Sequence, residues 1–186
     1  MSHADGLSIE YERHRRVRDL IAVVRYCLEG LSLGFDAHDD PHAKGPGAYL
    51  AVVAGLGLAD HADPMGSNRW PVEACAEPLV DLDAFSDTLA EVALTRDGAV
   101  VLSVDGVVQE QMVRFRDLPD GRSAYADWMG SRHMSALDTS RHESVVATLT
   151  LSQESGRVTA FRDGEYEAVE REAIAARWRS ADDQPV

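Results

Sequence analysis

The chain is poor in cysteine and lysine, and it has no long apolar run. Its longest weakly polar stretch, residues 48–59, is about half the length that a membrane span needs and carries two glycines, which excludes a transmembrane helix. The N-terminus has acidic residues and arginines where a signal peptide would have an apolar core, so none is expected. We therefore expect a cytoplasmic protein that does not associate with membranes.

Lysine occurs once, at Lys44, against seventeen arginines, and 32 acidic residues give the chain a net charge of −14. A surface of this sign repels phosphate backbones, which excludes nucleic acid as the principal partner. Acidic surfaces bind water and cations at high ionic strength, which indicates a salt-loving source. An ordinary acidic protein from a GC-rich genome is the alternative, and the salt dependence of folding separates the two.

The two cysteines, Cys27 and Cys75, are far apart and fit no metal-binding spacing, so we expect buried free thiols. Hydrophobic residues make up 45% of the 186 residues, enough for one packed domain. We expect a flexible leader at residues 1–7, one domain over residues 8–165, and a C-terminal helix and tail over residues 166–186.

Helical and strand-like patterns alternate along the chain. Residues 8–33 have apolar side chains at three- and four-residue steps, and Asp105-Gly106 between two apolar runs is a strong hairpin signal. This order predicts an α/β or α+β domain around one sheet. The expected helices are residues 8–33, residues 83–93 with Asp83 as N-cap, about ten residues capped by Ser131, and residues 165–179. The expected strands are residues 49–54, 99–104, 107–108, 145–151 and 158–161, and loops are expected at residues 35–47 and 60–71.

The first candidate site is Asp97-Gly98-Ala99, directly before an expected strand. An aspartate at a strand edge, beside two residues without bulky side chains, can approach a substrate closely. Its carboxylate can hold a divalent metal or accept a proton from a hydroxyl. Taken alone, the pattern more often makes an ordinary Asp-Gly turn.

The second candidate site is Gly130-Ser131-Arg132-His133, at an expected helix start. The first amides of a helix and the positive end of its dipole attract anions. Arg132 and His133 add charge-assisted donors. In so acidic a chain, a polyphosphate ligand needs such a local positive pocket. A simple helix cap with an exposed arginine is the alternative.

Together with a third motif, these segments resemble the diadenylate cyclase domain, found in the bacterial DNA-integrity scanning protein and in single-domain archaeal cyclases. The hallmarks of that family are a DGA motif, an Arg-His-Arg motif after Gly-Ser or Gly-Thr, and a strand that ends in Ser before an acidic turn. The resemblance is clear over residues 82–165 and looser over residues 17–81. The matching segments here are Asp97-Gly98-Ala99, Gly130-Ser131-Arg132-His133 and Thr150-Leu151-Ser152-Gln153-Glu154-Ser155-Gly156.

The resemblance implies an α/β fold, a single domain with a central mixed β-sheet flanked by helices. It also implies the condensation of two ATP molecules into cyclic di-AMP and two pyrophosphates, with Mn²⁺ or Mg²⁺. Each 3′-hydroxyl attacks the α-phosphate of the other ATP, so two protomers, each with one ATP, must face each other in a homodimer or higher homo-oligomer.

The same resemblance assigns a role to each motif residue. Asp97 is the catalytic residue and a metal ligand, and Glu154 is a second metal ligand near the nucleotide. The remaining expected ATP-binding residues are Gly98 and Ala99, which leave room for the nucleotide, Ser131, Arg132 and His133, which hold the phosphates, and Ser152.

The chain departs from the family pattern at Met134, where the second arginine of Arg-His-Arg is expected. A thioether gives a phosphate no useful hydrogen bond. The alternative function is therefore a nucleotide-binding module of the same fold that binds ATP or cyclic di-AMP with little or no turnover. Arg141 is the nearby residue expected to replace the charge. No helical DNA-binding domain follows the cyclase-like segment, so no role with DNA is expected.

A third hypothesis is a metal-dependent hydrolase. His38, Asp39, Asp40 and His42 have donors suited to Mn²⁺ or Zn²⁺, with His61 and Asp63 as further partners. Acidic loops in acidic proteins produce such clusters by chance, and Pro41 favours simple turn chemistry. The tryptophans Trp70, Trp128 and Trp178 are expected to pack rather than stack on bases, because basic residues do not alternate with them.

Overall fold

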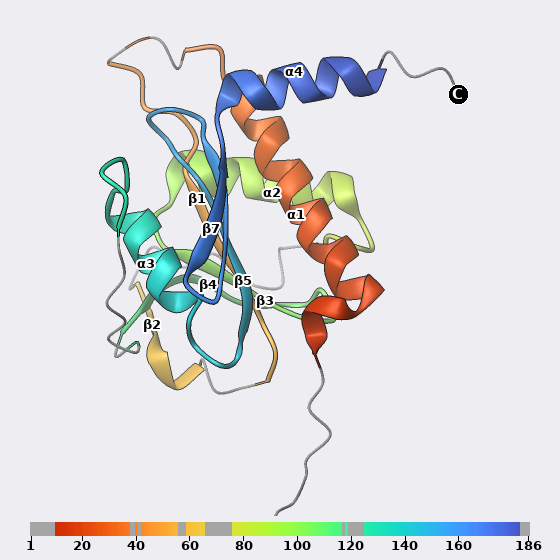
Figure 1. Ribbon diagram of the computed structural model, residues 1–186, viewed down its shortest axis with the longest axis vertical. Helices are drawn as coiled ribbons and strands as arrows, with labels where there is room; N and C mark the ends of the chain where they lie inside the picture. Colours follow the sequence, from red (N-terminus) through yellow and green to blue (C-terminus); the bar gives the residue numbers. More distant parts are fainter. Residues whose placement is uncertain are drawn as a thin grey trace, which may run out of the picture.

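A computed structural model describes residues 10–37, 40, 42–55, 59–65, 76–116, 118 and 125–182. Within these residues the fold is α/β, with one mixed seven-stranded sheet and four α-helices around it (Figure 1), as predicted. The strands are β1 (Ala48–Val53), β2 (Ala62–Pro64), β3 (Ala99–Ser103), β4 (Val108–Phe115), β5 (Val145–Leu151), β6 (Val158–Arg162) and β7 (Glu165–Val169). The helices are α1 (Arg15–Gly34), α2 (Leu82–Thr95), α3 (Ser131–Thr139) and α4 (Arg171–Asp182), with 3-10 turns η1 (Tyr11–Arg13) and η2 (Ala59–His61).

The strand order is β2-β4-β3-β1-β5-β6-β7. The central pair, β1 and β3, is parallel, and α2 makes the crossover between them, whereas all other neighbours in this sheet are antiparallel. The amino ends of β1 and β3 therefore meet the carboxyl end of the antiparallel β5 at one edge of the sheet. Residues 47, 97 and 152, which flank these ends, are thus brought together from distant parts of the chain.

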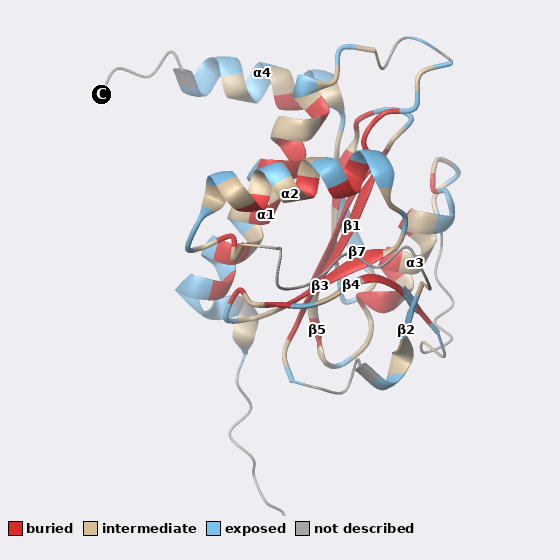
Figure 2. Cartoon of the chain, turned by 180° about the vertical axis from the view of Figure 1, so that it is seen from behind, coloured by how far each residue is buried: buried red, intermediate tan, exposed pale blue. Residues whose placement is uncertain are grey.

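Two apolar clusters cover the two faces of the sheet. The larger one packs α1, α2 and α4 on one face, and the smaller one packs α3 and the segment before it on the other. Buried residues follow the central strands and the inner sides of the helices (Figure 2). Cys27 is a buried free thiol of the larger cluster, as expected. No helix in the described part of the chain is long and apolar enough to cross a bilayer.

Several expected element boundaries were wrong. The last helix begins at Arg171, because residues 165–169 form β7 and pair with β6 across a turn at Asp163 and Gly164, whose φ angles are 51° and 79°. Such left-handed turns connect hairpins tightly. The charged residues that resembled a helix face lie on an exposed edge strand instead, where charge blocks pairing with other chains.

The helix starts differ as well. Asp81, not Asp83, caps α2 by accepting a hydrogen bond from Ala84 N at 3.0 Å. Gly130, not Ser131, is the N-cap of α3 and offers no side-chain cap. A short strand, β2, lies in the segment expected to be loop. Residues 1–7, Trp70 and Cys75 lie outside the described residues, so the expectations about them stay predictions.

Candidate functional site

The two candidate motifs meet at the sheet edge where β1 and β3 begin. Arg132 Nη2 on α3 lies 3.4 Å from Asp97 Oδ1, although 35 residues separate them in sequence. Gly47, directly before β1, lies against the same guanidinium, because a Cβ there would come within 3.1 Å of Arg132 Cζ and 3.0 Å of Gln153 Cβ. Four distant segments of the chain therefore converge on Arg132.

Asp97 presents its carboxylate to solvent. Its side chain is 74% exposed, and its Oδ1 accepts a hydrogen bond from Gly98 N at 2.9 Å. This local bond fixes the carboxylate at the entry to β3. Asp97 thus lies at the surface, two residues before β3 begins, where a substrate or a cation can reach its carboxylate.

Gly98 and Ala99 have a packing role. Gly98 has a φ of +112°, and a Cβ there would lie 2.9 Å from the backbone of Met112 and from Met65 Sδ. Met112 itself has a φ of +56° at an irregularity in the β3–β4 pairing. Ala99 is fully buried. Protein atoms therefore fill the space that a side chain at Gly98 would occupy, so a glycine is needed there for strand packing. The expectation that Gly98 and Ala99 leave room for a nucleotide stays a prediction.

The N-terminal turn of α3 supplies the positive part of the site. Arg132 has a side chain only 21% exposed, whereas Ser131 is exposed. Tyr49 Oη and Thr148 Oγ1 donate hydrogen bonds to the carbonyls of Ser135 and Ala136, at 3.4 and 2.8 Å, and hold the helix on the sheet. The first amides of α3 point out of the helix at this end, as in anion-binding sites.

His133 is buried and uncharged at neutral pH. Burial above all, and then the positive charges of Arg132 and Arg157, lower its pKa from 6.5 to about 4. The ring of Trp128 packs edge-on against the imidazole of His133, with the ring centroids 5.1 Å apart. His133 Nε2 has no hydrogen-bond partner among the described residues. The charge-assisted donor expected at this helix tip is therefore Arg132, and His133 can only make a neutral hydrogen bond.

Met134 and Arg141 do not supply a second charge. Met134 packs against the smaller apolar cluster. Arg141 lies beyond the other end of α3, where a Cβ on Gly164 would lie 2.9 Å from its Cζ. At about 1.5 Å per residue, that is more than 10 Å from Arg132 along the helix. The expectation that Arg141 replaces the missing arginine is wrong.

Arg157 is the residue that the sequence reasoning missed. It directly follows the Ser152–Gly156 turn, and its carbonyl accepts a hydrogen bond from Ser152 N at 2.9 Å. Its guanidinium lies 4.1 Å above the ring of Trp128, a cation–π contact. Trp128 is thus a packing residue, as expected. It contacts both His133 and Arg157, so the positive charge of Arg157 lies near His133. The sequence signal that could have identified Arg157 is its place directly after the Ser152–Gly156 turn.

Ser152 and Glu154 lie in the turn between β5 and β6. Ser152 is nearly buried, and its Oγ accepts hydrogen bonds from Glu154 N at 3.4 Å and Ser155 N at 3.3 Å. Gln153 O accepts a hydrogen bond from Gly45 N at 3.1 Å, which ties the turn to the segment before β1. Glu154 is exposed. Glu154 and Asp97 therefore both lie just beyond strand ends at the same sheet edge.

Asp97 and Glu154 could share Mn²⁺ or Mg²⁺ with a nucleotide, but they do not form a complete metal site by themselves. No group of three or more His, Cys, Asp or Glu side chains in the described part of the chain is arranged to hold a metal. Mg²⁺ is usually bound by one or two carboxylates together with substrate phosphates and water. Asp97 and Glu154 are suited to a cation that arrives with a nucleotide.

The loop that contains Asp40 and His42 has the hydrogen bond of an ordinary turn. His38 and Asp39 lie outside the described residues, and Asp40 Oδ1 accepts a hydrogen bond from His42 N at 2.8 Å. Asp63 pairs with Arg116 at 2.7 Å, and the ring of His61 contacts that of His142 at 5.1 Å. His61 and Asp63 therefore have other partners, and nothing here supports the hydrolase hypothesis.

The fold and the site together define an α/β domain in which the N-terminal turn of α3, with Arg132, meets acidic residues at one sheet edge. Residues 76–166 match the family model described as the DisA bacterial checkpoint controller nucleotide-binding domain, DAC. The matched segment contains all eight residues that the motifs singled out. The resemblance to the diadenylate cyclase domain family is thereby confirmed over that segment.

Solved structures share the fold. DacA from Staphylococcus aureus, crystallised as a double mutant, matches with a TM-score of 0.55 and 15% identity over 90% of this chain and 97% of its own. A hypothetical membrane-spanning protein from Bacillus cereus matches with a TM-score of 0.56 and 16% identity, over 81% of this chain and 63% of its own. A search of curated protein sequences gives no match.

Proposed function

We propose that this chain is a diadenylate cyclase that condenses two ATP molecules into cyclic di-AMP and two pyrophosphates. The observation that carries the proposal is the contact between Arg132 and Asp97, which unites two of the family's motifs at one sheet edge. One chain offers one such site, and the product needs two nucleotides. Two protomers must therefore face each other, each with one ATP.

The contact between Asp97 and Arg132 is suited to exchange. Asp97 is 74% exposed and the contact is 3.4 Å long, so water weakens the pair, which contributes on the order of 1 kcal/mol or less. Little stability is therefore lost when it opens. A phosphate offers the Arg132 guanidinium a stronger, charge-assisted partner. We infer that the triphosphate replaces Asp97 as the partner of Arg132, and that the Asp97 carboxylate then acts on the attacking 3′-hydroxyl, as metal ligand or proton acceptor.

The reaction needs positioning and charge neutralisation more than covalent help. The oxygen of one 3′-hydroxyl bonds to the α-phosphorus of the facing ATP, the bond to pyrophosphate breaks, and the hydroxyl proton leaves. Mn²⁺ or Mg²⁺, held by Asp97 and Glu154 together with the nucleotide, supplies charge neutralisation. Arg132, the Ser131 hydroxyl and the amides of α3 hold the phosphates, and neutral His133 and Ser152 complete the pocket wall.

The second candidate function is a nucleotide-binding module with weak or no turnover. Met134 favours it, because a packed thioether stands where the family has an arginine. The cytoplasmic location and the salt-loving source expected from the composition belong with this proposal as predictions. They do not decide between the two functions.

One experiment separates the candidates. The purified protein is incubated with ATP and Mn²⁺ or Mg²⁺ at low and high salt, and cyclic di-AMP is sought by mass. The enzyme predicts the cyclic product and its loss in Asp97→Asn. ATP binding without product supports the binding module, and the absence of both binding and product contradicts both functions.

A further inference from the structure

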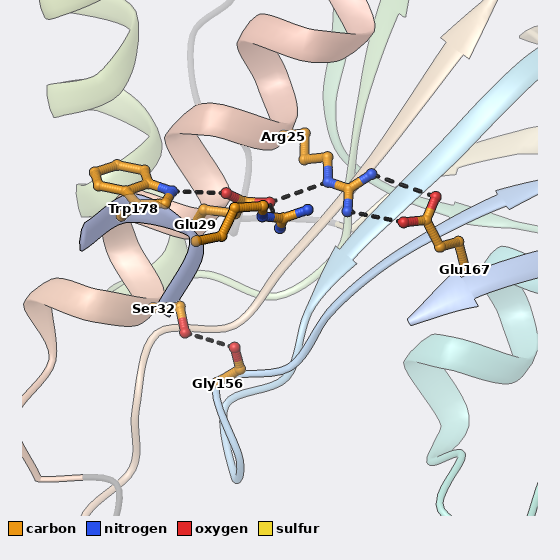
Figure 3. Close-up of polar contacts among 7 residues, drawn as sticks. Arg25, Glu29, Ser32, Gly156, Glu167 and Trp178 are labelled. Carbon is orange, nitrogen blue, oxygen red and sulfur yellow. Dashed lines mark hydrogen bonds and ion pairs between the residues drawn. The ribbon is translucent and has the colours of Figure 1, made fainter. Parts of the chain in front are cut away.

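The Ser152–Gly156 turn is held from outside by a buried serine of α1. Ser32 Oγ donates a hydrogen bond to Gly156 O at 2.5 Å, and Ser32 is fully buried (Figure 3). Gly156 N in turn donates to Ser152 O at 2.9 Å. Ser32, 124 residues before Gly156 in sequence, is therefore linked to Ser152 through Gly156. It fixes the C-terminal end of the turn that contains Glu154.

The first residue of α4 fixes Ser32. Arg171 Nε donates a hydrogen bond to Ser32 O at 3.0 Å, and its Nη2 donates to Leu33 O and Phe35 O, both at 3.3 Å. The last carbonyls of a helix have no partner within it, and a cation at this end is favoured by the dipole. Arg171 therefore caps the C-terminus of α1 at the residue that holds the turn.

The residue before Arg171 contacts the residue that directly follows the turn. Glu170 Oε1 accepts a hydrogen bond from Arg157 Nε at 2.6 Å, and Arg157 Nη2 is also 2.6 Å away. Two consecutive residues, Glu170 and Arg171, thus reach both Arg157 and, through Ser32, Gly156. The start of α4 therefore holds two consecutive residues at the C-terminal end of the turn.

Other contacts between α1 and α4 do not reach the turn. The buried carboxylate of Glu29 accepts hydrogen bonds from Arg25 Nε at 3.0 Å, Arg177 Nη2 at 2.7 Å and Trp178 Nε1 at 2.8 Å (Figure 3). Without Arg177, Arg25 and Trp178 still donate to Glu29, so α4 stays docked and the Ser32–Gly156 link stays in place. Arg177 is therefore a matched control for Arg171 on the same helix.

We propose that Arg171 and Ser32 are positioning residues, which transmit the docking of α4 to Ser152 and Glu154 and so set the affinity of the site for Mn²⁺ or Mg²⁺. The link itself stands on the hydrogen bonds above, and its effect on metal affinity rests on the proposed function. The matched family segment ends at residue 166, so Arg171 and α4 lie outside it. Groups that orient metal ligands typically change metal affinity about 10- to 100-fold when removed.

The test compares Ser32→Ala, Arg171→Gln, Arg171→Lys and the control Arg177→Gln in the full chain. The first readout is hydrogen–deuterium exchange of residues 152–158, which needs no activity. We expect faster exchange in Ser32→Ala and Arg171→Gln, partial rescue in Arg171→Lys, and wild-type exchange in Arg177→Gln. Equal exchange in all variants, or equally fast exchange in Arg177→Gln, overturns the link.

The second readout is the Mn²⁺ concentration that gives half the maximal rate of cyclic di-AMP formation. We expect this concentration to rise about tenfold or more in Ser32→Ala and Arg171→Gln, with an unchanged KM for ATP at saturating Mn²⁺. An unchanged Mn²⁺ requirement despite faster exchange overturns the effect on the metal site. If the wild type makes no product, the cyclase proposal fails, and the exchange comparison still decides the link.

Discussion

Arg132 reaches Asp97 across 35 residues of sequence, with Nη2 3.4 Å from Oδ1, and this contact ties the helix tip to the start of β3. The exposed aspartate is not needed for packing, so its removal tests chemistry rather than folding.

Asp97→Asn is expected to keep the fold and lower cyclic di-AMP formation by a factor of about 100 or more, the range of a lost metal ligand or proton acceptor. ATP binding without metal is expected to stay equal or become tighter, because Arg132 loses its competing anion. Turnover and metal-free ATP affinity are the measurements. Asp83→Asn, which removes another exposed carboxylate, is the control. Full turnover in Asp97→Asn contradicts the assigned role.

Gly47→Ala is expected to weaken ATP binding by about tenfold, the scale of one charge-assisted hydrogen bond. The new Cβ meets the guanidinium of Arg132 and Gln153 Cβ, and the mobile end of Arg132 is what gives way. Isothermal titration with ATP measures the loss. Gly34→Ala adds a Cβ that meets no atom of the described residues within 4 Å, and this variant should bind ATP normally. Unchanged ATP affinity in Gly47→Ala argues against phosphate binding by Arg132.

His133 makes stability depend on pH. Its pKa is lowered from 6.5 to about 4, so between these values the unfolded chain binds a proton that the folded chain does not. The resulting stability is present above pH 6.5 and is lost as the pH falls toward 4, by at most roughly 3 kcal/mol.

His133→Gln is therefore expected to flatten the pH dependence of the free energy of unfolding between pH 6.5 and 4. Urea titrations at several pH values measure it, with His14→Gln, at an exposed histidine, as control. The same slope in wild type and His133→Gln means that His133 ionises normally.

Gly98→Ala is expected to destabilise the fold by more than about 1 kcal/mol, because the left-handed backbone and the contact with Met112 both oppose a side chain. Gly55→Ala separates the two effects, since Gly55 has a φ of +89° and a Cβ there would meet no atom of the described part of the chain within 4 Å. Thermal unfolding should therefore show a larger drop in Tm for Gly98→Ala. Equal drops leave the backbone angle alone as the cause.

Local signals in the sequence predicted most of the elements. Asp105-Gly106 predicted the β3–β4 hairpin, and Gly106 has the expected left-handed φ of +92°. The same signal occurs at Asp163-Gly164, yet a helix was expected to follow it, because alternating glutamates on an edge strand resemble the charged face of a helix. The length and charge of a segment do not distinguish an exposed edge strand from a surface helix, because both expose charged side chains to water.

Tertiary relationships were beyond local signals. Gly47 matters because β1 and β3 pair in parallel, and Arg157 matters because it lies opposite Ser152 and over Trp128. His133 looked like a cation in the motif, and only its burial shows that it is neutral. The motifs predicted which residues would lie close together, whereas tertiary packing decides which of them are buried and which are charged.

The parallel pairing of β1 and β3 has a practical consequence. β1 is the strand between β3 and β5, yet it precedes residue 76, where the matched family segment begins. A fragment cut to residues 76–166 would leave two strands without the neighbour that joins them, and would also remove Gly47 from beneath Arg132. The smallest autonomous piece of this protein that can carry the site must start before residue 47.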